Sequence, residues 1–182
     1  MTRLFIALKI PGDIREKIID LRNSAVPFPQ KYKWENKNKI HLTLKFIGET
    51  KEELIKPISE EISFIEEYKK IECKLKNFGL FYRNGKPGIL WLGLELNSEI
   101  YNLVDRLNRE LEKFSIPAEQ KKFKPHLTIK RLKGYEGREF IHNFKNFVVP
   151  EIKFISNEIA LVKSELLPNG SNYKDLKIYK LK

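Results

Sequence analysis

Two of the three histidines in this 182-residue chain lie in nearly identical tetrapeptides. Residues 41–44 read HLTL, and 85 residues later (126 − 41) residues 126–129 read HLTI. Histidine has an ordinary pKa of about 6.5, so one imidazole can accept a proton near neutral pH while another donates one. A threonine hydroxyl can donate a hydrogen bond to an anionic oxygen. The two copies therefore predict metal-free acid and base catalysis at a phosphoester.

Each tetrapeptide stands in a run of alternating apolar and polar residues, which predicts a β-strand. Because successive side chains of a strand point to opposite faces, His41 shares a face with Thr43, and His126 with Thr128. The residues expected on the buried face of the first strand are Ile40, Leu42, Leu44 and Phe46. Displacement at phosphorus needs the attacking and leaving oxygens roughly in line, which two such half-sites facing across a groove would suit.

The elements that must position these strands follow from hydrophobic spacing. Alternation predicts strands within residues 4–8, 40–47, 71–75, 124–130, 152–162 and 176–181. Spacing of three and four residues predicts helices within 14–21, 54–65, 100–114 and 140–147. Pro57 should kink the second helix or delay its start. Asn84-Gly85 predicts a hairpin, residues 24–39 a loop, and Pro168-Asn169-Gly170 a turn.

Composition limits the class of protein. At 41% hydrophobic and 12% aromatic residues the chain is globular, and no apolar run reaches the ~18 residues of a membrane helix. The opening residues are too short and wrongly flanked for a signal peptide, and the single cysteine, Cys73, fits a buried structural thiol. These features predict a cytoplasmic protein. The net charge of +11 indicates a polyanionic partner, or else only a lysine-rich solvated surface.

The residues around the histidines resemble a known family. The segments that carry the likeness are 3–11 (RLFIALKIP), 34–49 (WENKNKIHLTLKFIGE), 89–94 (ILWLGL), 125–131 (PHLTIKR) and 161–173 (LVKSELLPNGSNY). They resemble the two-histidine (2H) phosphoesterases, and more narrowly the RNA 2′,3′-cyclic phosphodiesterases of the LigT-like (ThpR) branch, also described as 2′-5′ RNA ligases. The resemblance implies an α+β fold in which residues 1–182 form one domain of two similar lobes. Each lobe would hold an antiparallel sheet with packed helices, related by a pseudo-twofold axis around a central groove.

The resemblance also implies roles for the residues, with no metal and no cofactor. His41 would be the proton donor and His126 the proton acceptor, while Thr43 and Thr128 hold the phosphate oxygens. Arg131 stands where many relatives carry an arginine. Simple alternation instead aims Lys130 into the groove, unless the strand ends or bulges there. Both residues are therefore candidates for substrate binding.

Aromatic residues next to lysines suggest where RNA would bind. Trp34, in a loop with Lys31, Lys33, Lys37 and Lys39, is a candidate for stacking on a base, and Phe81 and Tyr82 are others. Trp91 fits the core better, and His142 fits the surface.

The leading hypothesis is hydrolysis of RNA 2′,3′-cyclic phosphate ends to 2′-phosphomonoesters, with reverse 2′-5′ ligation. The partner would be RNA with such an end, for example tRNA halves, bound by a monomer without a membrane. The alternatives are a phosphodiesterase acting on a small cyclic nucleotide and a non-catalytic RNA-binding module.

Overall fold

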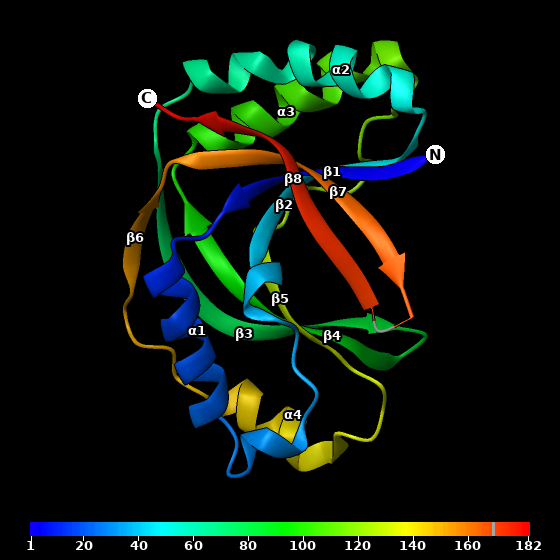
Figure 1. Cartoon of the computed structure of the whole chain (residues 1–182). Coiled ribbons are helices and arrows are strands. Elements are labelled where there is room, and N and C mark those ends of the chain that lie inside the picture. Colours follow the sequence, from blue (N-terminus) through cyan, green and yellow to red (C-terminus); the bar gives the residue numbers. More distant parts are fainter. Residues whose placement is uncertain (169) are drawn as a thin grey trace.

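The computed structural model describes residues 1–168 and 170–182, which form two four-stranded antiparallel sheets with helices packed around them (Figure 1). The first sheet has the order β2-β1-β7-β8, with β1 at Thr2–Lys9, β2 at His41–Thr50, β7 at Glu158–Leu167 and β8 at Gly170–Lys180. The second has the order β5-β4-β3-β6, with β3 at Ile71–Arg83, β4 at Lys86–Leu96, β5 at His126–Arg131 and β6 at Lys153–Ser156. Each sheet carries its histidine motif on an edge strand. The predicted α+β fold of two lobes is confirmed.

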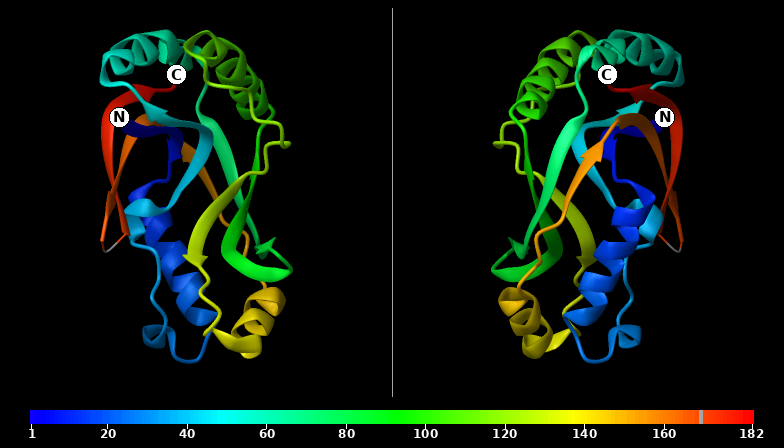
Figure 2. Two further views of the ribbon diagram at one scale, coloured as in Figure 1. Left: turned by 90° about the vertical axis from the view of Figure 1, so that its right-hand side faces the viewer. Right: turned by 90° about the vertical axis from the view of Figure 1, so that its left-hand side faces the viewer.

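The helices lie in pairs at the two ends of the molecule. Figure 2 shows α2 (Glu52–Glu61) beside α3 (Glu99–Leu111) at one end, and α1 (Gly12–Ser24) with α4 (Gly137–Asn146) at the other. Single-turn 3₁₀ segments occur at Pro29–Lys31, Lys37–Lys39 and Glu112–Phe114, and a longer one, Ile62–Glu67, continues α2. No helix among the described residues is long and apolar enough to cross a membrane.

The main core is a cluster that takes buried side chains from both sheets, and a second, smaller cluster of Phe5, Ala7, Ala160 and Val162 lies on the first sheet. Helix α3 contributes the predicted stripe of Ile100, Leu103, Val104, Leu107 and Leu111, all buried. Each such aliphatic side chain contributes about 1.5–3 kcal/mol when it leaves water. The two sheets are therefore held at a fixed relative position, which the site between them requires.

Three local predictions can be compared with the structure. Asn84 and Gly85 have φ values of 51° and 73°, so the predicted hairpin forms with the left-handed turn residues that match strand twist. Pro57 does not delay α2, which begins at Glu52. The single strand predicted at 152–162 is wrong, because the chain leaves the second sheet at Ser156 and enters the first at Glu158. In the predicted turn at 168–170, Asn169 lies outside the described residues.

Candidate active site

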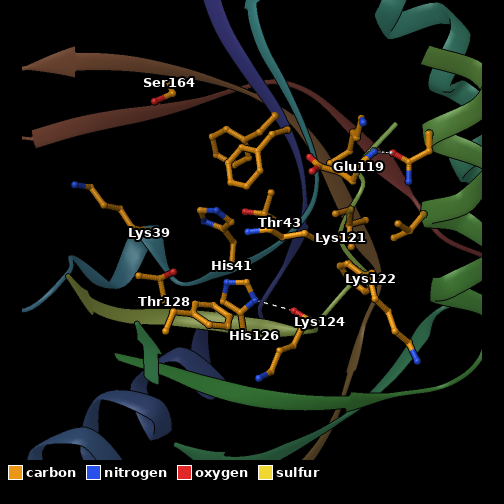
Figure 3. Close-up of a pocket in the computed structure, with 18 of the residues that line it drawn as sticks. Lys39, His41, Thr43, Glu119, Lys121, Lys122, Lys124, His126, Thr128 and Ser164 are labelled. Carbon is orange, nitrogen blue, oxygen red and sulfur yellow. Dashed lines mark hydrogen bonds between the residues drawn. The ribbon is translucent and has the colours of Figure 1, made fainter. Parts of the chain in front are cut away.

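A groove of about 1140 Å³ lies between the two sheets and contains all four motif side chains. His41 and Thr43 enter it from β2, and His126 and Thr128 enter it from β5. Figure 3 shows the two imidazoles close together between these strands, with Thr43 beside His41 and Thr128 beside His126. Two motifs that are far apart in the chain therefore form one site.

Each histidine is oriented by a backbone group two residues before it. The Nδ1 atom of His126 lies 2.7 Å from the carbonyl oxygen of Lys124. Because a carbonyl only accepts, Nδ1 carries the proton and Nε2 is the nitrogen left for chemistry. His41 makes the corresponding hydrogen bond to the backbone of Lys39. The same local geometry thus fixes both imidazoles.

Aromatic rings hold the imidazoles from the side. Phe5 of β1 stacks on His41, with ring centroids 5.0 Å apart and an interplanar angle of 24°. Tyr173 of β8 meets the His41 ring edge-on at 5.5 Å. On the other strand, Phe81 of β3 meets the ring of His126 edge-on at 4.8 Å. These contacts restrict the rotation of both rings and replace part of their water shell with apolar surface.

The apolar surroundings lower both histidine pKa values. Burial, helped by the positive charge of Lys9, lowers the pKa of His41 to about 4. Burial also lowers the pKa of His126, and the nearby Lys124 ammonium lowers it further. Both shifts favour the neutral imidazole at pH 7. An anionic phosphate would favour the charged form of either ring and raise its pKa.

A β-bulge reverses the faces of β2 just after its motif. Thr43 pairs with Ala7 but Lys45 pairs with Ile6, so the intervening Leu44 has no partner of its own on β1. Beyond the bulge Lys45 points into the protein and is 1% exposed, while Phe46 lines the groove and is 64% exposed. The prediction that Phe46 lies in the core is wrong, because one extra residue inverts the alternation.

Strand β5 bulges at the corresponding place. Thr128 pairs with Trp91 and Lys130 pairs with Leu90, which leaves Ile129 between them without a partner. Lys130 is turned into the core with 1% exposure, and Arg131 lines the groove. Alternation therefore gave the wrong result for Lys130. Of the two candidates at the end of this motif, Arg131 is the one that lines the groove.

The two lysines buried by the bulges reach the segments that lead to the opposite histidine. Lys130 Nζ donates to the carbonyl oxygen of Lys33 at 2.7 Å and pairs with the Glu136 carboxylate at 3.1 Å. Lys45 Nζ donates to the carbonyl oxygen of Pro117. Each motif strand thereby fixes the loop that precedes the other motif.

Trp34 does not line the groove. Its ring packs against Phe140 and Phe144 of α4, with centroids 5.9 and 6.0 Å away, and its Nε1–H donates to the carbonyl oxygen of Pro29 at 2.8 Å. The prediction that Trp34 stacks on a base is wrong in this structure, because α4 covers the ring. Among the four lysines around it, only Lys39 is part of the groove lining.

Other predicted residues are placed as follows. Phe81 and Tyr82 line the groove, as their candidate role requires. His142 is exposed on α4 and hydrogen-bonded to Asn146, away from the site. Cys73 is buried, and burial raises the pKa of its thiol to about 12, so it fits the predicted structural role.

The groove also contains residues that the motifs did not indicate. Lys121, Lys122 and Lys124 form part of the wall next to α3, and Tyr173 reaches in from β8. The lysines could have been predicted from their position, since they precede His126 at the same distance as residues 36–39 precede His41. For Tyr173 the sequence offered only its place in the family-like segment 161–173, because it comes from a strand far along the chain from both motifs.

Relatives with known names align with nearly the whole of this chain. The model of the LigT-like phosphoesterase family matches residues 8–91 and 94–173. The chain is 31% identical to an RNA 2′,3′-cyclic phosphodiesterase of Methanocaldococcus jannaschii, with 96% of this chain and 98% of that protein covered. It is 29% identical to a protein of the same name from Archaeoglobus fulgidus, with 97% and 99% covered.

Solved structures show the same fold. A protein of Thermus thermophilus superposes with a TM-score of 0.78 at 26% identity, covering 98% of this chain and 97% of that one. Escherichia coli LigT in complex with 3′-AMP superposes with a TM-score of 0.78 at 24% identity, covering 100% and 98%. The family match spans both histidine strands and most of the chain. The chain therefore belongs to the LigT-like phosphoesterase family.

Proposed function

We propose that this protein hydrolyses RNA 2′,3′-cyclic phosphate ends to 2′-phosphomonoesters. The observation that carries the proposal is the pair of His-x-Thr strands that face each other in one groove. Relatives that align over nearly the whole chain are named RNA 2′,3′-cyclic phosphodiesterases. The net charge of +11 suits an RNA substrate.

In the proposed reaction one histidine removes a proton from the attacking water, and the other gives a proton to the leaving oxygen. His126 takes a proton from water as the water oxygen attacks phosphorus, and the bond from phosphorus to O3′ breaks. His41 gives its proton to O3′, so the ribose gains a 3′-hydroxyl and the phosphate stays on O2′. Thr43 and Thr128 donate hydrogen bonds to the non-bridging oxygens, and Arg131 adds a positive charge at the rim of the groove. When a 5′-hydroxyl attacks phosphorus in place of water, His126 takes its proton, the bond from phosphorus to O3′ breaks in the same way, and a 2′-5′ linkage forms.

The substrate itself would supply the charge that the proton donor needs. Burial lowers the pKa of His41 to about 4, which favours the neutral ring at pH 7. The negative cyclic phosphate, once bound beside the ring, favours the imidazolium and raises that pKa. Binding and protonation of His41 are therefore coupled.

We expect the pH profile of kcat/KM to be bell-shaped with its maximum on the acidic side of about pH 6.5, the ordinary histidine pKa. The profile of kcat/KM reports the free enzyme, in which the pKa values of both histidines are lowered. At low pH kcat/KM falls because the catalytic base is protonated. At high pH kcat/KM falls because the catalytic acid has lost its proton. The profile of kcat reports the complex, and its maximum should lie at higher pH because the bound phosphate raises the pKa of His41. A kcat maximum at lower pH than the kcat/KM maximum would contradict this coupling.

The activity can be tested with a short RNA oligonucleotide that ends in a 2′,3′-cyclic phosphate. We expect it to be opened at an unchanged rate in EDTA, with a 2′-phosphomonoester as the product. The same oligonucleotide with a linear 3′-phosphate is the control and should not react. A 3′-phosphomonoester product would show that the wrong bond has been assigned, and no opening at all would refute the proposal.

The size of the groove favours RNA over a small cyclic nucleotide. Pockets for small molecules usually enclose about 300–1,000 Å³, and this groove of about 1140 Å³ is larger and open. A non-catalytic RNA-binding module would not need two oriented histidines. Action on tRNA halves and a monomeric state stay predictions of the family resemblance.

A further inference from the structure

The two loops that precede the histidines are equivalent in position, but they differ in how many of their side chains line the groove. Residues 34–39 lead to His41, and residues 119–124 lead to His126 at the same spacing. Both loops run beside the groove, yet only the second presents most of its side chains to it. This difference gives the groove two unlike ends, although the catalytic strands are matched.

The first loop has its charged and aromatic groups already engaged. Trp34 is packed under α4, and Lys37 pairs with Glu16 at 2.8 Å. Glu35 lies 3.6 Å from Lys39 and 3.9 Å from Arg131, so one carboxylate faces both cations at this end of the groove. Arg3, which lines the groove from the other end of β1, is paired with Glu49 at 3.2 Å.

The second loop is basic, and its lysines form no ion pair with the described residues. Lys121, Lys122 and Lys124 are exposed, and none of them lies within 4.0 Å of a carboxylate among the described residues. Figure 3 shows Lys121 and Lys122 on the α3 side of the histidines, with Lys39 on the opposite side. Two carboxylates, Asp105 and Glu119, line the same end, so lysines outnumber them three to two.

Aromatic rings stand among these lysines. Phe123 meets Tyr101 of α3 edge-on at 5.8 Å, and both line the groove. Lys124 Nζ lies 5.3 Å from the ring centroid of Phe81, the residue that contacts His126. Lysines for phosphates and rings for bases are the combination that binds single-stranded nucleic acid without sequence preference.

We propose that the RNA strand on the 5′ side of the cyclic phosphate lies along this basic wall, formed by residues 119–124 and Tyr101. Its phosphates would lie beside Lys121, Lys122 and Lys124, and a base would stack against the Tyr101–Phe123 pair. The inference rests on the proposed function, because it names where the rest of that substrate binds. It predicts that oligonucleotides bind more tightly than mononucleotides through one end of the groove only.

The test compares two matched double variants on two substrates. Lys121→Gln/Lys122→Gln removes charge from the basic wall, and Lys31→Gln/Lys37→Gln removes the same charge from the region of the first loop. The substrates are a short RNA oligonucleotide with a 2′,3′-cyclic phosphate end and a nucleoside 2′,3′-cyclic monophosphate. KM and kcat are measured over a range of salt concentrations, and thermal unfolding confirms that both variants are folded.

For Lys121→Gln/Lys122→Gln we expect KM for the oligonucleotide to rise with little change in kcat. The dependence of log KM on log salt should flatten by about 0.7 for each phosphate contact that is lost. KM for the mononucleotide should change far less, since it carries one phosphate. The control variant should match the wild type on both substrates.

Equal effects of the two double variants, or no effect of the first, would overturn the inference. Failure of the proposed function looks different, because the wild-type protein would then leave the oligonucleotide unopened, whether or not it opens the mononucleotide. If it opens both and Lys121→Gln/Lys122→Gln is normal on the oligonucleotide, only the path of the strand is wrong.

Discussion

Replacing either His41 or His126 with alanine should reduce kcat for cyclic-phosphate opening by about 10²–10⁴-fold, the usual contribution of a general acid or base. Each imidazole holds one half of a single proton cycle, so neither can substitute for the other. The double variant should lose little more than the worse single variant, because residues that act as a unit are not additive. The measurement is single-turnover opening of a cyclic-phosphate RNA oligonucleotide.

The third histidine offers a matched control. His142→Ala should leave kcat and KM unchanged, since His142 is exposed on α4 and, among the described residues, its side chain is hydrogen-bonded to Asn146 of the same helix. Because Phe5 stacks on His41, the variant His41→Gln should be measured as well, since it keeps more of the side-chain volume in that packing. Near-wild-type turnover in a folded variant of either groove histidine would rule out the paired mechanism.

Much of this site can be predicted from the sequence because its parts are encoded locally. A histidine and a threonine two residues apart on an alternating strand must share a face, and the two copies repeat that pattern. The amphipathic stripe of α3 and the Asn84-Gly85 turn are local signals of the same kind. Local pattern therefore predicted the motif strands, the helices around them and the residues most suited to catalysis.

The errors arise where distant parts of the chain decide the outcome. The alternation of apolar and polar residues continues through Leu44 and Ile129. The neighbouring residues do not indicate that each strand has an unpaired residue there. Trp34 is held by contacts with Phe140 and Phe144, which lie about a hundred positions further along the chain. Its basic neighbours suggested an RNA contact, but burial against α4 prevents it.

The two bulge lysines should differ in their importance for stability, because only one has a buried partner of opposite charge. Burial alone would raise the pKa of Glu136, yet backbone N–H groups and Lys130 hold it below its ordinary value. The carboxylate therefore stays ionised in the protein. Lys130→Met would leave that charge without its ammonium partner, which typically costs about 3–5 kcal/mol of unfolding free energy.

Lys45 is expected to be more easily replaced. Its Nζ donates to one carbonyl, that of Pro117, and pairs with no carboxylate within 4.0 Å among the described residues. Burial lowers the pKa of this lysine, so its charge is a cost that methionine would remove. The variant Lys45→Met leaves one carbonyl without its donor, a loss of about 1–3 kcal/mol.

Denaturant unfolding of Lys45→Met, Lys130→Met and the double variant Lys130→Met/Glu136→Gln measures this difference. The double variant should recover part of the loss of Lys130→Met, because the unpaired charge is gone while the amide oxygen can still accept from the N–H groups of Lys133 and Gly134. Equal losses for the two lysines, or no recovery in the double variant, would show that the Glu136 charge does not decide the cost. The bulge after the second motif would then be held by packing rather than by the ion pair inside it.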